Sequence, residues 1–262
     1  MNRIAIASLA QDWENKNNNL ASCIELVKKA KEYKSEIIIF PEMTLTAFSM
    51  NLNYTAESFN NSSTVKAFEE MSQNNSIAII FGVVFKHEIK ATNSAIMVND
   101  EGIMLGRYNK LHPFSFSGEH NYFESGEQLF YTKYHGITIG ITICYDLRFP
   151  EVYSALGKKC DLVLNIANWP LQRIDHWNTL LKARAIENQI FIAGINRTGN
   201  DGNGNIYPKS SIIFDPNGSA LEPIYGEDEI DVYEVEFSFV NDFRSAFSTT
   251  QDRRVDFYKT IL

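Results

Sequence analysis

The chain of 262 residues is long enough for one large α/β domain, and because no linker-like segment divides it, we expect a single domain over residues 1–262. Its formal net charge of −8, with basic residues scattered among acidic ones, argues against a nucleic-acid surface or a basic membrane patch and favours a small-molecule or protein partner. Three cysteines without paired spacing predict neither a disulfide framework nor a metal site, and they favour a reducing, cytoplasmic setting.

The first half of the chain alternates apolar runs with helical patterns. Residues 4–9 are predicted to form a strand, and this N-terminal segment lacks the longer apolar stretch and cleavage site of a signal peptide. The run at 36–40 is continuously apolar before Pro41, which is typical of a strand buried on both faces. The other predicted elements are a helix with Leu20, Ile24, Val27 and Ala30 on one face, a helix with Val65, Phe68 and Met71, a strand at 77–85, and a hairpin at 93–110 with its turn at 100–102.

The second half repeats this alternation. Buried strands are predicted at 137–143 and 162–166, and three further strands at 190–196, 210–218 and 231–237. Between them, residues 175–189 have a helical pattern that groups Trp177, Leu180, Leu181 and Arg184 on one side. The alternation predicts an α/β fold whose inner strands are covered by helices on at least one face. No stretch reaches the roughly 18 apolar residues that indicate a membrane span.

Three reactive side chains follow predicted strands directly. They are Glu42, Lys110 and Cys144. In α/β proteins, catalytic groups tend to lie beyond the carboxyl ends of strands, where loops gather over a rigid sheet. A thiolate can attack a carbonyl or nitrile carbon, a carboxylate can take the thiol proton and later activate water, and an ammonium can stabilise the developing oxyanion. The three residue types therefore predict a cysteine hydrolase that requires no histidine.

Each of these residues also has an ordinary structural interpretation. A free cysteine is often a core residue, Glu42 could cap a helix, and Lys110 could be a solvated turn lysine. The order of the three residues and their positions after strands favour the catalytic interpretation. A Cys-His hydrolase is the competing mechanism; His112 or His120 could line a pocket, but neither stands in a papain-like or caspase-like signature.

Three segments that contain these residues resemble a known family. "FPEM" at 40–43, "YNKLH" at 108–112 and "CYDLRFPE" at 144–151 are similar, in order and separation, to the signature segments of the nitrilase superfamily, the carbon-nitrogen hydrolases. The resemblance runs nearly end to end, because "NIANWP", "HWNTLLKARAIENQ", "NRTGNDGNGNIY" and "DPNG" recur in similar form in that family. Three motifs in order are a far more specific signal than one.

The resemblance implies a single carbon-nitrogen hydrolase domain with a four-layer α-β-β-α sandwich, acting without metal or organic cofactor. It implies Cys144 as the nucleophile, Glu42 as the general base and Lys110 as the stabiliser of the oxyanion. Glu119 aligns with a second glutamate of the family that supports substrate positioning and proton transfer. The backbone N–H of Tyr145 would complete the oxyanion hole. Self-association as a homodimer through a helix-lined interface is also implied.

Within the superfamily, the sequence is most similar to the omega-amidase branch. The segments that carry this similarity are "CYDLRFPE", "NWP", "HW..LL.ARAIENQ" and "DGNG..Y". Such enzymes hydrolyse the terminal amide of a 2-oxo dicarboxylic acid monoamide, such as 2-oxoglutaramate or 2-oxosuccinamate, to the dicarboxylate and ammonia. An aliphatic amidase, an N-carbamoyl amidohydrolase or a nitrilase is the alternative, and a non-catalytic scaffold is a more distant one. The segment "YPKSS" departs from the family pattern and leaves the roles of Lys209 and Ser210 open.

A 2-oxo acid requires a cation for its carboxylate, and the planar fork of arginine suits this task. We expect Arg173 to bind substrate. For Arg148 we expect an internal ion pair with Asp146 or Glu151 that shapes the nucleophile turn. The remaining expectations are that Asn168 and Trp169 line the pocket wall, that Phe116 closes the pocket, that residues 200–207 form a surface loop, and that Cys23 and Cys160 are structural thiols.

Overall fold

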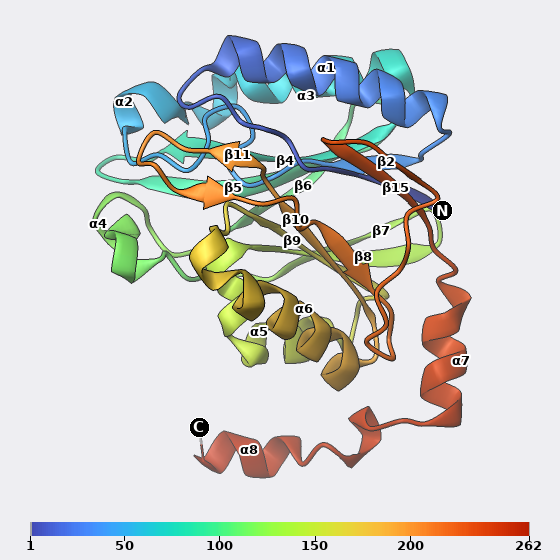
Figure 1. The fold of residues 1–262 in the computed structure, drawn as a ribbon. Coiled ribbons are helices and arrows are strands. Elements are labelled where there is room, and N and C mark those ends of the chain that lie inside the picture. Colours follow the sequence, from blue (N-terminus) through green and yellow to red (C-terminus); the bar gives the residue numbers. More distant parts are fainter. Residues whose placement is uncertain (1, 262) are drawn as a thin grey trace.

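A computed structural model describes residues 2–261 of the chain. Two β-sheets pack face to face, and helices cover the outer face of each, so that four layers follow one another as α-β-β-α (Figure 1). The first sheet is covered by α1 (Lys16–Glu32) and α3 (Ser63–Asn75), and the second by α5 (Pro150–Leu156) and α6 (Ile174–Asn188). Within the described range, no helix is both long and apolar enough to cross a membrane.

The first sheet has eight strands in the order β14-β15-β1-β2-β4-β5-β6, with β3 paired to β4. β1, β2 and β4 are parallel to one another, whereas β4, β5 and β6 form an antiparallel ladder. β6 therefore runs in the same direction as β2. The strands span β1 Arg3–Ala7, β2 Ile37–Ile39, β3 Ala56–Glu57, β4 Ala78–Lys86, β5 Ala91–Val98, β6 Met104–Asn109, β14 Tyr225–Gly226 and β15 Ile230–Glu234.

The second sheet has five strands in the order β13-β10-β9-β8-β7. β8, β9 and β10 are parallel, and the outer strands β7 and β13 are antiparallel to their neighbours. A separate pair, β11 and β12, lies in a loop beyond β10. The strands span β7 Phe130–Tyr134, β8 Ile137–Ile143, β9 Leu162–Ala167, β10 Phe191–Asn196, β11 Gly199–Asn200, β12 Ile206–Tyr207 and β13 Ile212–Phe214.

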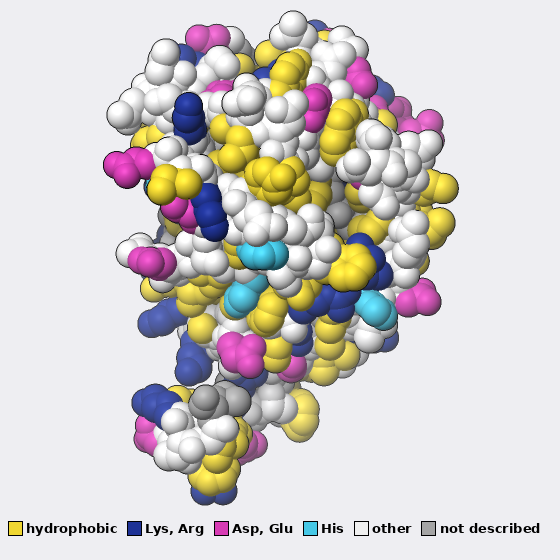
Figure 2. Space-filling view, turned by 90° about the vertical axis from the view of Figure 1, so that its left-hand side faces the viewer, with side chains coloured by type: hydrophobic (Ala, Val, Ile, Leu, Met, Phe, Trp, Pro, Cys, Tyr) yellow, Lys and Arg dark blue, Asp and Glu magenta, His cyan; other side chains and the backbone are white. Residues whose placement is uncertain are grey.

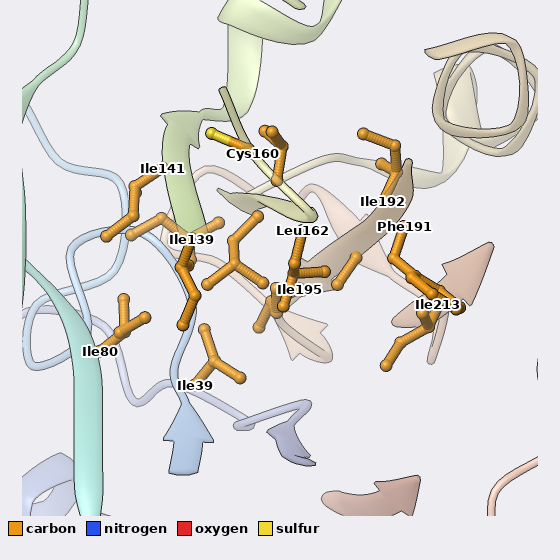
Figure 3. Close-up of a cluster of buried hydrophobic side chains, with 14 of the residues drawn as sticks. Ile39, Ile80, Ile139, Ile141, Cys160, Leu162, Phe191, Ile192, Ile195 and Ile213 are labelled. Atoms are coloured by element: carbon orange, nitrogen blue, oxygen red, sulfur yellow. The ribbon is translucent and has the colours of Figure 1, made fainter. Parts of the chain in front are cut away.

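The continuous apolar runs of the inner strands arise because both faces of each sheet are buried. In β2, Ile37 and Ile39 point into the core between the sheets, and Ile38 points into the core under α1 and α3. Figure 3 shows Ile39 and Ile80 of the first sheet facing Ile139 and other aliphatic side chains of the second. This apolar contact between the two sheets fixes the strands whose ends carry the reactive residues.

Most predicted elements are confirmed, and the predicted buried face of the first helix is correct at Val27 and Ala30 but wrong at Ile24. The face of α1 that packs on the sheet carries Asn19, Cys23, Leu26, Val27 and Ala30, whereas Ile24 is 38% exposed. Asn19 belongs to this face because its side chain donates hydrogen bonds to the carbonyls of residues 12 and 45. Because a search for apolar residues passes over Asn19, the predicted face was turned slightly toward Ile24.

The C-terminal segment leaves the body of the sandwich. After β15 the chain forms α7 (Ser238–Ala246), which runs down the right-hand side of Figure 1, and α8 (Val255–Ile261), which lies below α6. α7 is anchored, since Val240 is fully buried and Arg244 donates hydrogen bonds to the carbonyls of Gly157 and Asn188. α8 contains no buried residue among those described, and it carries apolar side chains into solvent.

Candidate active site

The three predicted strand-end residues lie at one edge of the facing sheets. Glu42 follows β2 and Lys110 follows β6, and because these strands run in the same direction, their carboxyl ends lie at the same edge of the first sheet. Cys144 directly follows β8 of the second sheet. Glu42 and Lys110 are buried and Cys144 is half-buried. The fold thus brings a carboxylate, an ammonium and a thiol together from two sheets.

Two carboxylates enclose the Lys110 ammonium. Its Nζ lies 2.9 Å from Oε1 of Glu42, 2.9 Å from Oε2 of Glu119 and 3.1 Å from Oε1 of Glu119. All three side chains are at most 1% exposed. Burial alone would lower the pKa of Lys110, but the charges of Glu119 and Glu42 outweigh it and raise that pKa above its ordinary value. Lys110 therefore stays a charged ammonium at neutral pH.

Asn93, on β5, joins the two carboxylates. Its Nδ2 donates hydrogen bonds to Oε1 of Glu42 at 2.7 Å and to Oε1 of Glu119 at 3.1 Å. Glu119 also accepts a hydrogen bond from the backbone N–H of Phe114, which fixes the loop after Lys110. The sequence does not mark Asn93 as a site residue, because it stands between two other polar residues, Thr92 and Ser94. All three are buried in the structure.

Asn168, the first residue after β9, links the carboxylate to the thiol. Its backbone N–H donates to Oε2 of Glu42 at 3.0 Å, and its side-chain Nδ2 donates to the Glu42 carbonyl at 2.8 Å. Its backbone carbonyl accepts from Sγ of Cys144 at 3.9 Å. One residue of the second sheet therefore holds both Glu42 and Cys144.

The turn that carries Cys144 is strained and strongly anchored. Cys144 has φ of 46°, in the left-handed region, where a non-glycine residue stores about 1–3 kcal/mol of strain. The buried carboxylate of Asp146 accepts hydrogen bonds from the N–H of Ile143 at 3.0 Å, the hydroxyl of Tyr108 at 2.7 Å, and the N–H of His112 at 3.0 Å. His112 Nδ1 lies 2.8 Å from the same carboxylate. These bonds hold the nucleophile turn onto β6 and its following loop.

The Cys144 thiol is protonated at rest. Burial raises its pKa well above the ordinary value, the negative charge of Glu42 raises it further, and the positive charge of Lys110 only partly opposes these effects. A thiol in this state requires a base to become a nucleophile. His112 is held by Asp146 and stacks on Phe149, with ring centroids 3.7 Å apart.

A pocket of about 520 Å³ opens above these groups. It is lined by Lys110 and Cys144 and by all five residues predicted to bind substrate: Tyr145, Phe116, Asn168, Trp169 and Arg173. Phe116 lies at the rim and is 84% exposed, so it does not close the pocket. In Figure 2, which turns the side carrying α2 (Leu52–Thr55) and α4 (Glu119–Tyr122) toward the viewer, hydrophobic side chains gather in the middle of the face with basic ones beside them.

The expected ion pair of Arg148 is wrong. Within residues 2–261, no ion pair joins Arg148 to Asp146 or Glu151. Asp146 is occupied by the hydrogen bonds described above, and the Arg148 guanidinium instead lines the pocket, 5.0 Å from the ring centroid of Trp169. Closeness in sequence did not predict the partner, because Asp146 is bound to β6 and its following loop while Arg148 lines the pocket.

The exposed loop expected at residues 200–207 is a small hairpin, because its ends pair as β11 and β12 and Tyr207 is buried, and this hairpin also lines the pocket. Asp201, Asn203, Asn205 and Tyr207 all contribute to the wall. The Asp201 carboxylate accepts hydrogen bonds from the backbone N–H groups of Asn203 and Asn205 and from the Tyr207 hydroxyl, which shapes the loop.

The two residues whose roles the sequence left open do not line the pocket. Lys209 pairs with Asp231 at 2.8 Å, and the Ser210 hydroxyl accepts a hydrogen bond from Asn196 at 3.0 Å. Both therefore support the loop and strand around them. Cys23 and Cys160 are buried free thiols in the apolar cores, as expected.

Comparison with known proteins identifies relatives over most of the chain. The carbon-nitrogen hydrolase family matches residues 3–243. The omega-amidase YafV of Yersinia enterocolitica is 38% identical over 183 residues, which are 70% of each chain. The omega-amidase YafV of Escherichia coli K12 is 34% identical and covers 83% of this chain and 84% of its own. The 2-oxoglutaramate amidase of Bacillus subtilis is 31% identical over 89% of this chain and 93% of its own.

Solved structures show the same architecture. XC1258 from Xanthomonas campestris, described as a CN-hydrolase superfamily protein, superposes with a TM-score of 0.89 at 28% identity, covering 96% of this chain and 97% of its own. An amidase from Nesterenkonia sp. AN1 superposes with a TM-score of 0.87 at 22% identity over the whole of both chains. The α-β-β-α sandwich is thus the nitrilase fold, as the sequence predicts. This chain belongs to the carbon-nitrogen hydrolase family.

Proposed function

We propose that this protein is a cysteine-dependent amidase that hydrolyses the terminal amide of a small 2-oxo dicarboxylic acid monoamide, such as 2-oxoglutaramate or 2-oxosuccinamate. The observation that carries the proposal is the buried contact of Lys110 with Glu42 and Glu119 beside the Cys144 thiol, at the floor of the pocket. The substrate class is supported by the similarity to omega-amidases and to a 2-oxoglutaramate amidase over most of this chain.

In the first half of the reaction, Glu42 removes the proton from Cys144 as the sulfur attacks the amide carbon. A base is required here because the thiol has a raised pKa. The negative charge that develops on the amide oxygen is stabilised by the Lys110 ammonium and by the backbone N–H of Tyr145. The tetrahedral intermediate collapses when the C–N bond breaks, and Glu42 delivers its proton to the departing amine. Ammonia leaves, and a thioester to Cys144 remains.

In the second half, water occupies the space that ammonia has left. Glu42 takes a proton from this water as its oxygen attacks the thioester carbon, and the same two donors stabilise the second oxyanion. The C–S bond breaks, the sulfur recovers its proton from Glu42, and the dicarboxylic acid departs. The sum is one amide and one water converted to one acid and one ammonia.

Glu119 acts in this scheme by holding Lys110. Its two oxygens bind the ammonium and also accept hydrogen bonds from Asn93 and from the N–H of Phe114, and the bond from Phe114 ties the pocket loop to the same point. Removing Glu119 would leave Lys110 free to bind Glu42 alone. We assign Glu119 to substrate positioning through Lys110 and through this loop.

A substrate panel tests the proposal. Purified protein is expected to release ammonia from 2-oxoglutaramate with a higher kcat/KM than from an aliphatic amide, an N-carbamoyl amino acid or a nitrile. A preference for one of the last three would replace the proposed substrate with that class while retaining the thioester chemistry. Failure of every compound to react, together with no covalent labelling of Cys144 by electrophilic amide analogues, would favour a non-catalytic scaffold instead.

We also propose a homodimer and a cytoplasmic location for this single carbon-nitrogen hydrolase domain over residues 1–262. The exposed apolar residues of α8, Val255, Phe257 and Tyr258, support association of the C-terminal segment with a second copy. A nucleophilic thiol among three unpaired cysteines supports a reducing compartment. Light scattering of the purified chain tests the homodimer. A monomeric mass at micromolar concentration would exclude a stable dimer.

A further inference from the structure

The turn that carries Glu42, residues 41–44, is strained. Met43, the residue after the carboxylate, has φ of 48°, in the left-handed region, where a non-glycine residue stores about 1–3 kcal/mol of strain. Gly82 of β4 packs so closely on this turn that a Cβ atom there would stand 2.3 Å from the backbone nitrogen of Met43. Such a backbone keeps its conformation only where surrounding groups hold it. The direction of the Glu42 carboxylate therefore depends on the groups that hold this turn.

The side-chain amide of Gln11 is one of these groups. Its Nε2 lies 3.0 Å from the carbonyl oxygen of Glu42, 2.9 Å from that of Met43 and 3.1 Å from that of Thr44. An amide NH₂ group has two donors, so the three acceptors share them. The reverse placement of the amide would set Oε1 against the same three oxygens, which would repel it. Gln11 therefore binds the backbone on both sides of the strained residue.

The burial of Gln11 has a cost that packing alone does not explain. The side chain is 2% exposed, and its Oε1 has no hydrogen-bond partner within residues 2–261. An unpaired buried acceptor typically costs about 1–3 kcal/mol. An apolar side chain of similar size would avoid this cost but would no longer bind the turn. The amide at position 11 thus serves the turn that it holds rather than the stability of the core.

Arg197 fixes Gln11 from the second sheet. It directly follows β10 and is fully buried, and its Nη2 donates hydrogen bonds to the carbonyls of Gln11 at 2.7 Å and of Asn200 at 2.9 Å. Asn200 belongs to the hairpin at 199–207, which lines the pocket. The same guanidinium lies over Tyr207 of this hairpin, 4.7 Å from the ring centroid. One chain of contacts therefore joins the Glu42 turn, Gln11 and the pocket hairpin.

We propose that Gln11 is a positioning residue for proton transfer, which directs the Glu42 carboxylate by holding its turn, and that Arg197 ties Gln11 to the pocket hairpin. The inference rests on the proposed function, because Glu42 there moves protons among the sulfur of Cys144, the departing amine and water. Neither Gln11 nor Arg197 lines the pocket, so Gln11 acts through the turn alone. A carboxylate released by about 1 Å would transfer protons far more slowly, because proton transfer requires hydrogen-bond distance.

The test compares two buried amides. Gln11→Met removes the amide and keeps the length of the side chain. Asn19→Leu is the matched control, because Asn19 joins the same two loops through the carbonyls of residues 12 and 45 but does not bind residues 41–44. Arg197→Lys, a second variant, keeps the charge and loses the fork.

Two reactions are followed for each protein in ordinary and in heavy water. One is steady-state hydrolysis of 2-oxoglutaramate, and the other is acylation of Cys144 by p-nitrophenyl acetate, read as the burst of p-nitrophenolate. The burst amplitude gives the concentration of active protein, so that rates are expressed per active site. The ester is informative because its leaving group departs without a proton, whereas ammonia does not.

We expect Gln11→Met to lower kcat by roughly ten- to a hundredfold with KM within about threefold of the parent. The ratio of kcat in ordinary water to kcat in heavy water should rise, because proton transfer becomes the slow step. Ester acylation should fall less than amide hydrolysis does, Arg197→Lys should lie between parent and Gln11→Met, and Asn19→Leu should keep kcat within about threefold.

Two results would overturn the proposal. The first is an equal fall of both reactions in Gln11→Met with an unchanged isotope ratio, because a merely structural role predicts that result. The second is an equal loss of kcat in Gln11→Met and Asn19→Leu, because the contact with residues 41–44 would then have no special effect.

The ester separates this inference from the proposed function. If 2-oxoglutaramate is not hydrolysed, but the ester acylates Cys144 with an isotope ratio that rises in Gln11→Met, the proposed substrate is wrong and the positioning role stands. If Gln11→Met hydrolyses 2-oxoglutaramate with the kcat and the isotope ratio of the parent, the proposed function stands and the positioning role is wrong.

Discussion

The Nζ atom of Lys110 lies 2.9 Å from Oε1 of Glu42, with both side chains buried at the meeting point of two sheets. This ion pair stabilises the buried interior, and the same two groups have catalytic roles in the proposed mechanism. In the proposed mechanism Glu42 moves protons and Lys110 binds the oxyanion, and their contact holds each group in place against the other. The pair therefore fixes the distance between proton transfer and charge stabilisation before substrate arrives.

Replacement of Lys110 by Met is expected to damage both stability and activity. It leaves two buried carboxylates without their cation, a change that typically costs about 3–5 kcal/mol of unfolding free energy. The kcat should fall by at least roughly a hundredfold, because an oxyanion donor is lost. Lys209→Met is the control, since the Lys209–Asp231 pair is partly exposed and such pairs contribute about 0–1 kcal/mol. Equal stability losses in urea unfolding of the two variants would contradict this account.

The stabilising effect of Lys110 should also limit stability at high pH. Its pKa is raised in the folded state, so its contribution is complete below the unfolded pKa of about 10.4 and is lost as the pH rises beyond that value. The unfolding free energy of the unmodified chain should fall above about pH 10 more steeply than that of Lys110→Met. If the unfolding free energies of the two proteins changed with pH in parallel, Lys110 would have the same pKa in the folded and the unfolded state.

Asn93 is expected to be a positioning residue for both carboxylates. Asn93→Ala removes hydrogen bonds to Glu42 and Glu119 and should lower kcat by about tenfold, with a smaller change in KM, because bonds to charged groups contribute about 1.5–3 kcal/mol. Asn93→Asp should lower kcat further than Asn93→Ala does, since it adds a third carboxylate beside Glu42 and Glu119. Steady-state kinetics with 2-oxoglutaramate check this order. An Asp variant more active than the Ala variant would refute the role.

Cys144 should react slowly with alkylating agents at neutral pH. Its thiol has a raised pKa from burial and from the charge of Glu42, so little thiolate is present without substrate. The rate of iodoacetamide labelling, followed by mass spectrometry on Cys144, should still be rising above about pH 9, past the pKa of an ordinary thiol. A rate that reaches its plateau below pH 7 would instead indicate a thiolate paired with an imidazolium, as in a Cys-His hydrolase.

The sequence was sufficient for the fold class and for bringing Glu42, Lys110 and Cys144 to one place. Apolar runs marked the buried strands, and the shared direction of β2 and β6 places Glu42 and Lys110 at one edge of the first sheet. Cys144 lies on the second sheet, and the four-layer arrangement that brings it to the same place was implied by the resemblance to the family. The hairpin turn at Gly102, with φ of 79°, was predicted for a similar reason, because its turn residues interrupt two apolar runs.

Contacts between distant segments could not be predicted in this way. Asn93 and Asp146 are polar groups inside a packed interior, and their partners come from strands and loops 26 to 51 residues away. The direction of Arg148 depends on the strained turn at Cys144, which no periodicity reports. Ile24 was wrongly placed in the buried face of α1, because Asn19 is buried there through hydrogen bonds rather than through hydrophobicity. Asn19, Asn93 and Asp146 are polar residues whose hydrogen bonds come from tertiary contacts, and sequence patterns do not report such contacts.

The most direct test of the central claim is ammonia release from 2-oxoglutaramate by Cys144→Ala, with Cys160→Ala as the matched control. Cys160 is a buried free thiol that lies outside the pocket. We predict that Cys144→Ala keeps a cooperative thermal transition but loses all measurable turnover, and that folded Cys160→Ala retains turnover. Turnover by Cys144→Ala close to that of the unmodified chain would contradict the thioester mechanism.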